Sequence, residues 1–165
     1  MITVQYPEPR FRTKIEAGKR YVFDEIRKAW LLLTEEEWVR QNFVQYLIRH
    51  LNYPAASIAL EKEIRVNGLR KRFDILVYDD HFQPLLLVEC KAPNVQLQEA
   101  VLQQALRYHM TVPVSYIIIT NGSFTLGWHR SGGELELMNE IPGYGSDPFQ
   151  RPKGIEEDKD RSPHQ

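Results

Sequence analysis

The fold is decided by the stretch Pro84-Leu85-Leu86-Leu87-Val88-Glu89-Cys90-Lys91, an apolar run that ends in charged residues. Consecutive large apolar residues over such a short length are typical of a strand buried on both faces in the middle of a sheet. Because side chains alternate along a strand, Glu89 and Lys91 project from one face and Cys90 from the other. The stretch therefore predicts a central strand that presents a carboxylate and an ammonium group side by side.

A predicted β-hairpin precedes this strand. Ser57–Val66 alternates apolar with charged residues, as a half-buried strand does, and Lys71–Tyr78 returns as a second strand. The dipeptide Asn67-Gly68 between them suits a type I′ turn, in which both residues have positive φ. After the central strand we expect a helix, a buried strand and two outer antiparallel strands, at Asn94–Met110, Val114–Thr120, Phe124–Trp128 and Glu134–Met138.

Two helices are expected ahead of the hairpin. Thr34–Leu51 begins with an N-cap candidate, Thr34, and Glu37 completes a capping box, after which apolar residues recur at helical spacing. A shorter helix is predicted over Asp24–Leu33. The order of elements predicts an α/β fold with an αβββαβ core, in which helices flank a mixed sheet and extra antiparallel strands follow at the C-terminal side.

The length of 165 residues and the 42% of hydrophobic residues predict one folded domain with a substantial core. We expect this domain over residues 1–141. A mobile, charged tail rich in proline and glycine should follow over residues 142–165, where few large apolar residues offset the ordering entropy. No apolar run of about 18 residues predicts a membrane span. The single cysteine argues for the cytoplasm and against a disulfide framework, and the net charge of −1 excludes a uniformly basic coat.

Two carboxylates and an ammonium group are predicted to converge at the end of the central strand. The hairpin brings Asp74, in its second strand, beside Glu89 and Lys91. Carboxylate oxygens suit Mg²⁺ or Mn²⁺, so Asp74 and Glu89 are candidate metal ligands, and Lys91 would position water or stabilise developing charge. Without a cation the two carboxylates should share a raised pKa. The alternative interpretation is a strand that ends in a surface salt bridge.

The spacing of these residues resembles a known nuclease signature. Asp74, fourteen intervening residues and Glu89-Cys90-Lys91 are similar to the Asp…Glu-x-Lys pattern of the PD-(D/E)XK nuclease superfamily. More specifically, five segments resemble the N-terminal nuclease domain of type I restriction enzyme R subunits: Glu35–Gln41, Arg72–Ile75, Val88–Pro93, Gln104–Tyr108 and Thr120–Gly122. The resemblance implies a restriction-endonuclease-like fold and a Mg²⁺-dependent endonuclease that hydrolyses the phosphodiester bonds of DNA.

The resemblance also implies supporting residues on the two helices. A glutamate of the first helix would support metal binding, and orientation favours Glu36, because Glu37 lies about 100° away around the helix. The opposing interpretation is that this acidic run complements the helix dipole. Gln104 and Tyr108, four residues apart on one helix face, match the family's Gln-x-x-x-Tyr motif and are expected to contact DNA. Without the resemblance, Tyr108 would be a core residue and Gln104 a solvated one.

A basic cluster lies beside the predicted turn of the hairpin. Arg70, Lys71 and Arg72 could hold DNA phosphates without reading the base sequence. Equally, these charges could protect an edge strand, and Arg72 could pair with Asp74.

Other chemistry has little support in the sequence. The five histidines show no paired-ligand spacing, and no Gly-x-x-x-x-Gly-Lys motif of a nucleotide-hydrolysing motor is present. Since R subunits carry motor domains, a separate motor or specificity protein is an expected partner in addition to DNA. The main alternative function is a non-catalytic DNA-binding or assembly module that keeps the nuclease fold. A structural domain with an incidental carboxylate cluster is a third possibility.

Overall fold

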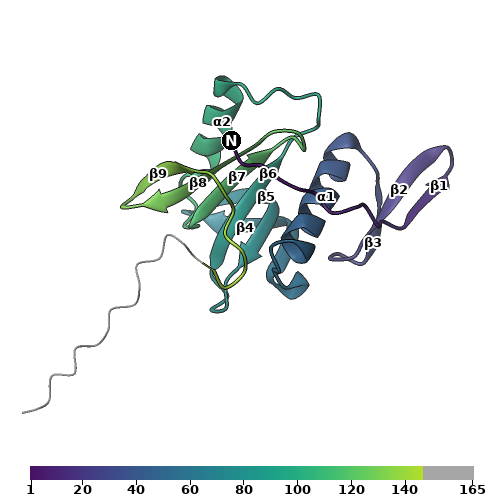
Figure 1. Ribbon diagram of the computed structural model, residues 1–165, viewed down its shortest axis with the longest axis horizontal. Coiled ribbons are helices and arrows are strands. Elements are labelled where there is room, and N and C mark those ends of the chain that lie inside the picture. Colours follow the sequence, from purple (N-terminus) through teal and green to yellow (C-terminus); the bar gives the residue numbers. More distant parts are fainter. Residues whose placement is uncertain (147–165) are drawn as a thin grey trace, which may run out of the picture.

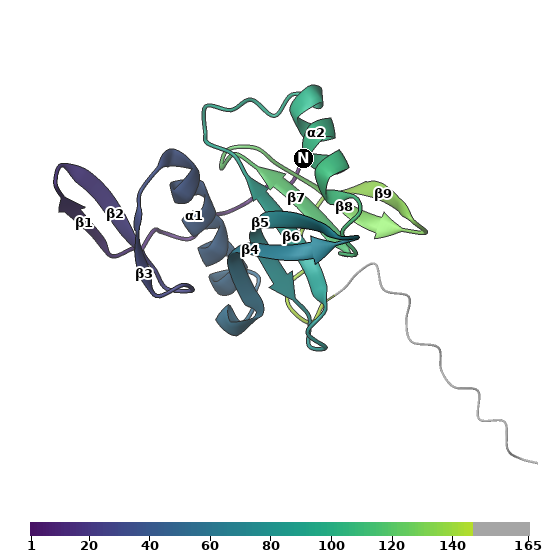
Figure 2. The ribbon, with the colours of Figure 1, turned by 180° about the vertical axis from the view of Figure 1, so that it is seen from behind.

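Helix α1 (Glu35–Arg49) stands between two β-sheets in the computed structural model, which describes residues 1–146 (Figure 1). The smaller sheet is antiparallel and has the order β1-β2-β3, with strands Thr13–Glu16, Lys19–Asp24 and Ala29–Leu32. The larger sheet lies on the other side of α1, and helix α2 (Glu99–His109) covers its opposite face (Figure 2).

The larger sheet has six strands in the order β4-β5-β6-β7-β8-β9. After a 3₁₀ turn at Ala55–Ser57, these strands are Ile58–Val66, Leu69–Tyr78, Pro84–Cys90, Tyr116–Thr120, Thr125–Ser131 and Glu134–Met138. β6 and β7 are parallel, whereas every other neighbouring pair is antiparallel. The predicted α/β class, with a mixed sheet and further antiparallel strands at its C-terminal side, is therefore confirmed.

Strand β6 is buried on both faces, as its apolar run predicts. Leu86 and Val88 pack in the cluster that contains the apolar residues of α1, and Leu87 packs in a separate cluster together with Leu106 of α2. The alternation continues beyond the apolar run, because Cys90 joins the α1 cluster while Glu89 reaches the C-terminal end of α2. The predicted opposition of Glu89 and Cys90 is thus confirmed.

The β4–β5 hairpin turns at Asn67-Gly68, where both residues have positive φ (49° and 77°) and Val66 pairs with Leu69. This is the two-residue turn that the dipeptide predicts.

Strand β4 changes face half-way along its length, which its sequence does not predict. Ile58 and Leu60 pack in the α1 cluster, whereas Ile64 and Val66 pack against the cluster on the α2 side. Strict alternation would place all four residues on one face. Glu61 lies between the two pairs with a φ of 49°, a left-handed conformation that is unfavourable for a residue with a Cβ.

Strand β5 changes face at the position opposite. Phe73 packs on the α2 side and Ile75 on the α1 side, so Asp74 stands at the point of change. The register of β5 with β6 begins at Ile75 opposite Val88, and the pairing does not include Asp74. The two strands therefore separate beside Asp74, and this separation makes room for a cleft.

Helix α1 begins where the sequence predicts, but half of the expected capping box is missing. The Thr34 hydroxyl accepts a hydrogen bond from the backbone N–H of Glu37 at 3.0 Å. The reciprocal bond does not form, because the Thr34 N–H donates to the Leu32 carbonyl and the Glu37 carboxylate is bound to arginine and glutamine side chains. Glu37 is therefore committed to tertiary contacts.

The predicted helix over Asp24–Leu33 is wrong. This segment is the end of β2, a turn, and β3, with Asp24 paired to Ala29. The physical reason is the Asp24 side chain, whose Oδ1 accepts hydrogen bonds from the N–H groups of Ile26 and Arg27 at 2.8 and 2.9 Å. A buried aspartate thus closes a turn between two strands, and the small sheet was not expected.

Helix α2 is shorter than predicted, because it starts at Glu99 rather than Asn94. The residues ahead of it form a loop, which Asn121 anchors by donating from its side-chain amide to the Val95 carbonyl at 2.9 Å. Together with α2, this loop forms the crossover connection between the parallel strands β6 and β7.

The first residues of the predicted tail, 142–146, contact the folded part of the chain. Pro142 is buried, and its carbonyl accepts a hydrogen bond from the Tyr53 hydroxyl at 2.8 Å. Tyr144 donates from its N–H to the Leu51 carbonyl and from its hydroxyl to Asp80. The rest of the predicted tail, residues 147–165, lies outside the described residues, and the boundary after residue 141 stays a prediction. Within residues 1–146, no helix is long and apolar enough to cross a membrane.

Candidate functional site

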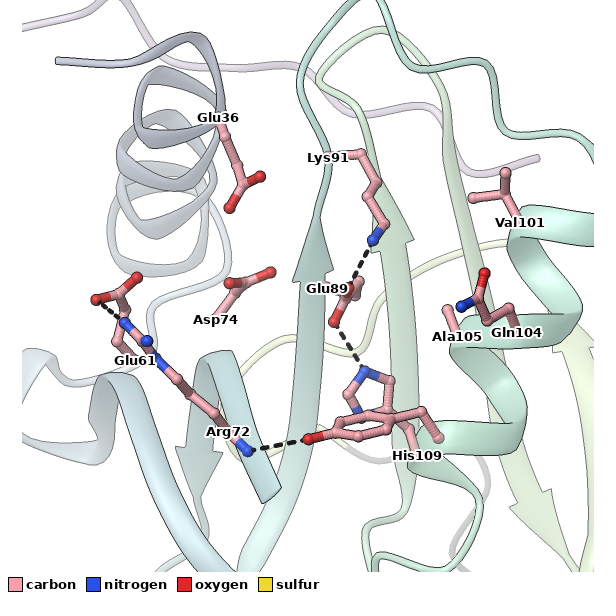
Figure 3. Close-up of a pocket in the computed structure, with 11 residues that line it drawn as sticks. Glu36, Glu61, Arg72, Asp74, Glu89, Lys91, Val101, Gln104, Ala105 and His109 are labelled. Atoms are coloured by element: carbon pink, nitrogen blue, oxygen red, sulfur yellow. Dashed lines mark hydrogen bonds and ion pairs between the residues drawn. The ribbon is translucent and has the colours of Figure 1, made fainter. Parts of the chain in front are cut away.

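A cleft of about 470 Å³ opens between the first turn of α1, the middle of β4 and β5, the C-terminal end of β6, and α2 (Figure 3). Four carboxylates line it together with basic, aromatic and amide side chains: Glu36, Glu61, Arg72, Asp74, Glu89, Lys91, Val101, Gln104, Ala105, Tyr108 and His109. All four residues for which the sequence predicts a catalytic role lie in this cleft, although they come from three different elements and from the residue after β6.

Asp74 is held by both of its oxygens. Oδ2 accepts a hydrogen bond from the backbone N–H of Cys90 at 2.7 Å, which bridges the gap between β5 and β6. Oδ1 lies 3.1 Å from the guanidinium of Arg40, which belongs to α1. Burial raises the pKa of Asp74, and so does the charge of Glu89, although the Cys90 N–H and Arg40 act in the opposite direction. The side chain is therefore oriented before any ligand binds.

Glu89 lies between two nitrogen donors (Figure 3). Its oxygens are 2.9 Å from Lys91 Nζ and 2.8 Å from His109 Nε2. Burial alone would raise the pKa of Glu89, but the hydrogen bonds from His109 and Lys91 outweigh it and lower the pKa to about 2. The expectation that Asp74 and Glu89 share a raised pKa is therefore wrong for Glu89.

Lys91 keeps its proton in this environment. Burial opposes the charged form, but the hydrogen bond to Glu89 and the charges of Asp74 and Glu36 prevail and raise the pKa of Lys91. The side chain can thus act at neutral pH as a cation and hydrogen-bond donor, and not as a base.

His109 is a site residue that the sequence reasoning missed. Its ring is 1% exposed, and its Nδ1 has no hydrogen-bond partner within residues 1–146. Because Glu89 is ionised at neutral pH, its partner Nε2 must be the donor of their hydrogen bond. A signal was present in the sequence, since His109 lies four residues after Ala105 on the buried side of α2, where a polar residue needs a partner.

The first helix turns Glu36 toward the cleft and Glu37 away from it. Glu36 lines the cleft, and its pKa is raised by burial and by the charge of Asp74. Glu37 is buried and binds Arg27 at 2.9 Å and also Arg40. The orientation expected for the two glutamates is therefore observed.

Arg40 is a second residue without a predicted role. Its side chain is 3% exposed, and its guanidinium contacts four carboxylates: Glu36 at 3.2 Å, Glu61 at 3.4 Å, Asp74 at 3.1 Å, and Glu37. Burial would lower the pKa of Arg40, but these neighbouring charges raise it. It is thus a fixed cation beneath the cleft.

Gln104 and Tyr108 both line the cleft from α2, and Gln104 lies on the side opposite Glu36 (Figure 3). Tyr108 is not a core residue, because 44% of it is exposed. Its hydroxyl accepts a hydrogen bond from the backbone N–H of Arg72 at 3.3 Å. This contact joins α2 to the hairpin across one end of the cleft.

The three basic residues of the hairpin have three different environments. Arg70 is exposed and lies 3.5 Å from Glu63. Arg72 lines the cleft and pairs with Glu61 at 2.5 Å, so the suggested pair with Asp74 is not formed. Lys71 is 8% exposed, and its ammonium group donates hydrogen bonds to the Tyr108 carbonyl and to the Thr111 hydroxyl. It therefore satisfies a free carbonyl at the C-terminal end of α2, where a positive charge is favourable. Its ammonium group is thus engaged by α2, and the contact of Lys71 with phosphates stays a prediction.

The charges of the cleft fit a divalent cation. The lining holds four carboxylates against Arg72 and Lys91, which leaves two negative charges when histidine is counted as neutral. Within residues 1–146, no three His, Cys, Asp or Glu side chains form a ready-made metal cage. Mg²⁺ commonly takes only one or two carboxylates and completes its shell with water, so Asp74 and Glu89 match its requirements as ligands.

Comparisons with known proteins give a family and a fold. A family model described as "Type I restriction enzyme R protein N terminus (HSDR_N)" matches residues 35–142. Among solved structures, a fragment described as an HsdR subunit of a type I restriction enzyme from Vibrio vulnificus YJ016 is 23% identical with a TM-score of 0.50. That match covers 67% of this chain and 24% of that chain, and it shows a similar fold. No curated protein matches.

Proposed function

This chain belongs to the family of type I restriction enzyme R protein N termini, and we propose from that premise that it is a metal-dependent nuclease domain that hydrolyses phosphodiester bonds of DNA. One observation carries the proposal: a single cleft gathers Asp74, Glu89 and Lys91 with Glu36 and Gln104. The Asp…Glu-x-Lys spacing and the αβββαβ order of the core support membership of the PD-(D/E)XK superfamily and its restriction-endonuclease-like core.

In the proposed reaction Asp74 and Glu89 would hold Mg²⁺ or Mn²⁺, with Glu36 in support from α1. When bound, such an ion polarises a phosphate oxygen and lowers the pKa of a coordinated water. Lys91 would donate a hydrogen bond to the attacking water or to the charge that develops on the phosphate, since its raised pKa keeps it protonated.

DNA would enter the cleft, which α2 and the hairpin border. Gln104 and Tyr108 would contact the backbone from α2, and Arg70 and Arg72 would contact phosphates from the hairpin. These contacts position a duplex but carry no sequence preference. A motor or specificity protein would then supply the choice of site, and we place the complex in the cytoplasm.

A second candidate function is a DNA-binding or assembly module that keeps the fold without cleaving. The observation in its favour is that the key carboxylates already have partners: Asp74 binds Arg40, and Glu89 binds Lys91 and His109. Satisfied in this way, they form a stable ion-pair cluster that needs no metal.

The two candidates are separated by measuring metal binding, DNA binding and cleavage on the same variants. Mn²⁺ should raise the melting temperature of the wild type but not of Asp74→Asn, whereas Glu134→Gln, a change at an exposed carboxylate of β9, should behave like wild type. Lys91→Ala should keep its DNA affinity while metal-dependent cleavage of a plasmid falls by about 10²–10³-fold. DNA binding by the wild type without cleavage in Mn²⁺ would establish the binding module instead.

A further inference from the structure

The cluster of charges beneath the cleft extends well beyond the cleft itself, to the small sheet at the N-terminal end of the chain. The turn between β2 and β3 carries Arg27, which does not line the cleft. It also precedes residues 35–142, the region that matches the family.

The turn aims Arg27 at helix α1. Asp24 is completely buried, and its Oδ2 lies 2.5 Å from Arg27 Nε and 3.1 Å from the Gln41 side-chain amide. Because Asp24 Oδ1 also accepts the backbone N–H of Arg27, both the backbone and the side chain of Arg27 are fixed by one carboxylate. Only 21% of the Arg27 side chain is exposed.

The guanidinium of Arg27 then binds two of the four carboxylates that contact Arg40. It lies 2.9 Å from Glu37 Oε1 and 3.2 Å from Glu61 Oε2. The other oxygens of these two carboxylates, Glu37 Oε2 and Glu61 Oε1, contact Arg40. Each shared carboxylate therefore joins one arginine to the other.

Arg40 completes the connection to the cleft, since its Nη2 lies 3.1 Å from Asp74 Oδ1. Buried charges in one network depend on one another, because removal of one member leaves its partners uncompensated. If Arg27 is lost, Glu37 and Glu61 each lose one cationic partner, and both then depend more strongly on Arg40, which they already contact. A shift of Arg40 toward them withdraws it from Asp74.

We propose that Arg27 is a positioning residue of the cleft, which fixes Asp74 in its metal-binding orientation through Glu37, Glu61 and Arg40. The N-terminal sheet then contributes to the site, because its β2–β3 turn holds Arg27 in place. This inference rests on the proposed role of Asp74 as a metal ligand.

Positioning and simple electrostatics predict opposite results for Arg27→Gln. Loss of a positive charge makes the cluster more negative, so electrostatics alone would tighten the binding of a divalent cation. Loss of positioning should weaken it about tenfold, the lower end of the effects that outer residues have on metal affinity. Arg27→Lys keeps the charge but cannot bind three carboxylates in the same geometry, so positioning predicts a smaller loss and electrostatics predicts none.

The experiment titrates Mn²⁺ into the wild type, Arg27→Gln, Arg27→Lys and Lys28→Gln by calorimetry. Lys28 is a matched control, because it follows Arg27 on the same turn, is exposed, and pairs only with Glu25 at 3.3 Å among residues 1–146. A second, metal-free measurement is the NMR resonance of the Cys90 amide, whose N–H donates to Asp74. The chemical shift of this amide should change in both Arg27 variants and stay unchanged in Lys28→Gln. The amide of Trp128 in β8 should keep its chemical shift in all variants, which would show that the fold is intact.

The outcomes are distinct. Weaker Mn²⁺ binding by both Arg27 variants, with a displaced Cys90 amide, is the expected result. Unchanged or tighter binding would overturn the inference and leave Arg27 as an attachment of the small sheet, while the proposed function would stand. If the wild type itself binds no Mn²⁺, both the metal site and the inference fail. Should Arg27→Gln not fold, the comparison of Arg27→Lys with Lys28→Gln decides.

Discussion

Glu89→Gln should cost stability in a way that depends strongly on pH. A glutamine is close in shape to a protonated glutamate, so the change removes the charge that Lys91 and His109 stabilise. A pKa lowered from 4.5 to about 2 corresponds to roughly 3 kcal/mol, at about 1.4 kcal/mol per unit. The same ion pair raises the pKa of Lys91, and its contribution is counted once.

The sign follows from the direction of the shift. The folded-state pKa of Glu89 is below its unfolded value, so the stabilisation is complete above about pH 4.5 and is lost as the pH falls through 2. Wild type should therefore exceed Glu89→Gln by about 3 kcal/mol near neutral pH and by about 2 kcal/mol near pH 3.5. Urea unfolding of both proteins in the presence of a chelator measures the difference, with Glu134→Gln as the control. A difference that is small at neutral pH, or that does not shrink on acidification, would refute the assignment of Lys91 and His109 as the partners that stabilise the Glu89 charge.

Further predictions concern ligands of the cleft. Gln104→Ala and Tyr108→Phe should lower DNA affinity or cleavage while leaving the stabilisation by Mn²⁺ intact. Both side chains line the cleft from α2, and neither contacts Asp74 or Glu89. If both variants bind and cleave DNA like the wild type, these residues do not contact DNA. The affinity for Mn²⁺ should rise with pH through the acidic range and level off toward neutrality, because protons compete with the ion for carboxylates whose pKa is raised. Burial raises the pKa of Asp74 and Glu36, and the charge of Glu89 adds to the shift of Asp74 as the charge of Asp74 adds to that of Glu36. Calorimetry across that range checks this, and an affinity independent of pH would exclude Asp74 as a ligand.

The sequence was informative wherever local geometry decides the outcome. Alternation along one strand was enough to place Glu89 and Lys91 together and Cys90 behind them. The helical wheel distinguished Glu36 from Glu37, and the spacing of four residues put Gln104 and Tyr108 on the same wall of the cleft. These relations depend only on the repeat of a strand or a helix, so they hold wherever the strand or helix is regular.

It failed where a side chain replaces the expected local pattern with a tertiary contact. Asp24 binds the backbone of its own turn and the side chain of Gln41, so a segment with helical composition becomes a strand–turn–strand unit. Lys71 looks like a surface cation of a hairpin, but the C-terminal end of α2 binds its ammonium group. The partners of Asp24 and Lys71 are remote in sequence or depend on how a neighbouring element packs. The hydrophobic periodicity of the sequence does not reveal such partners.

The position of Asp74 depends on an irregularity of β4 and β5 that the sequence does not predict. A regular β4 would keep Ile58 and Val66 on one face, but the left-handed conformation of Glu61 rotates the strand between them. Opposite Glu61, Asp74 is released from the pairing with β6 and stands between the two faces of the sheet. Its carboxylate can then reach Arg40 on one side and the Cys90 N–H on the other. The backbone strain at Glu61 and the open cleft are thus two aspects of the same irregularity, and Arg27, Arg40 and Arg72 balance the charge of Glu61 at that point.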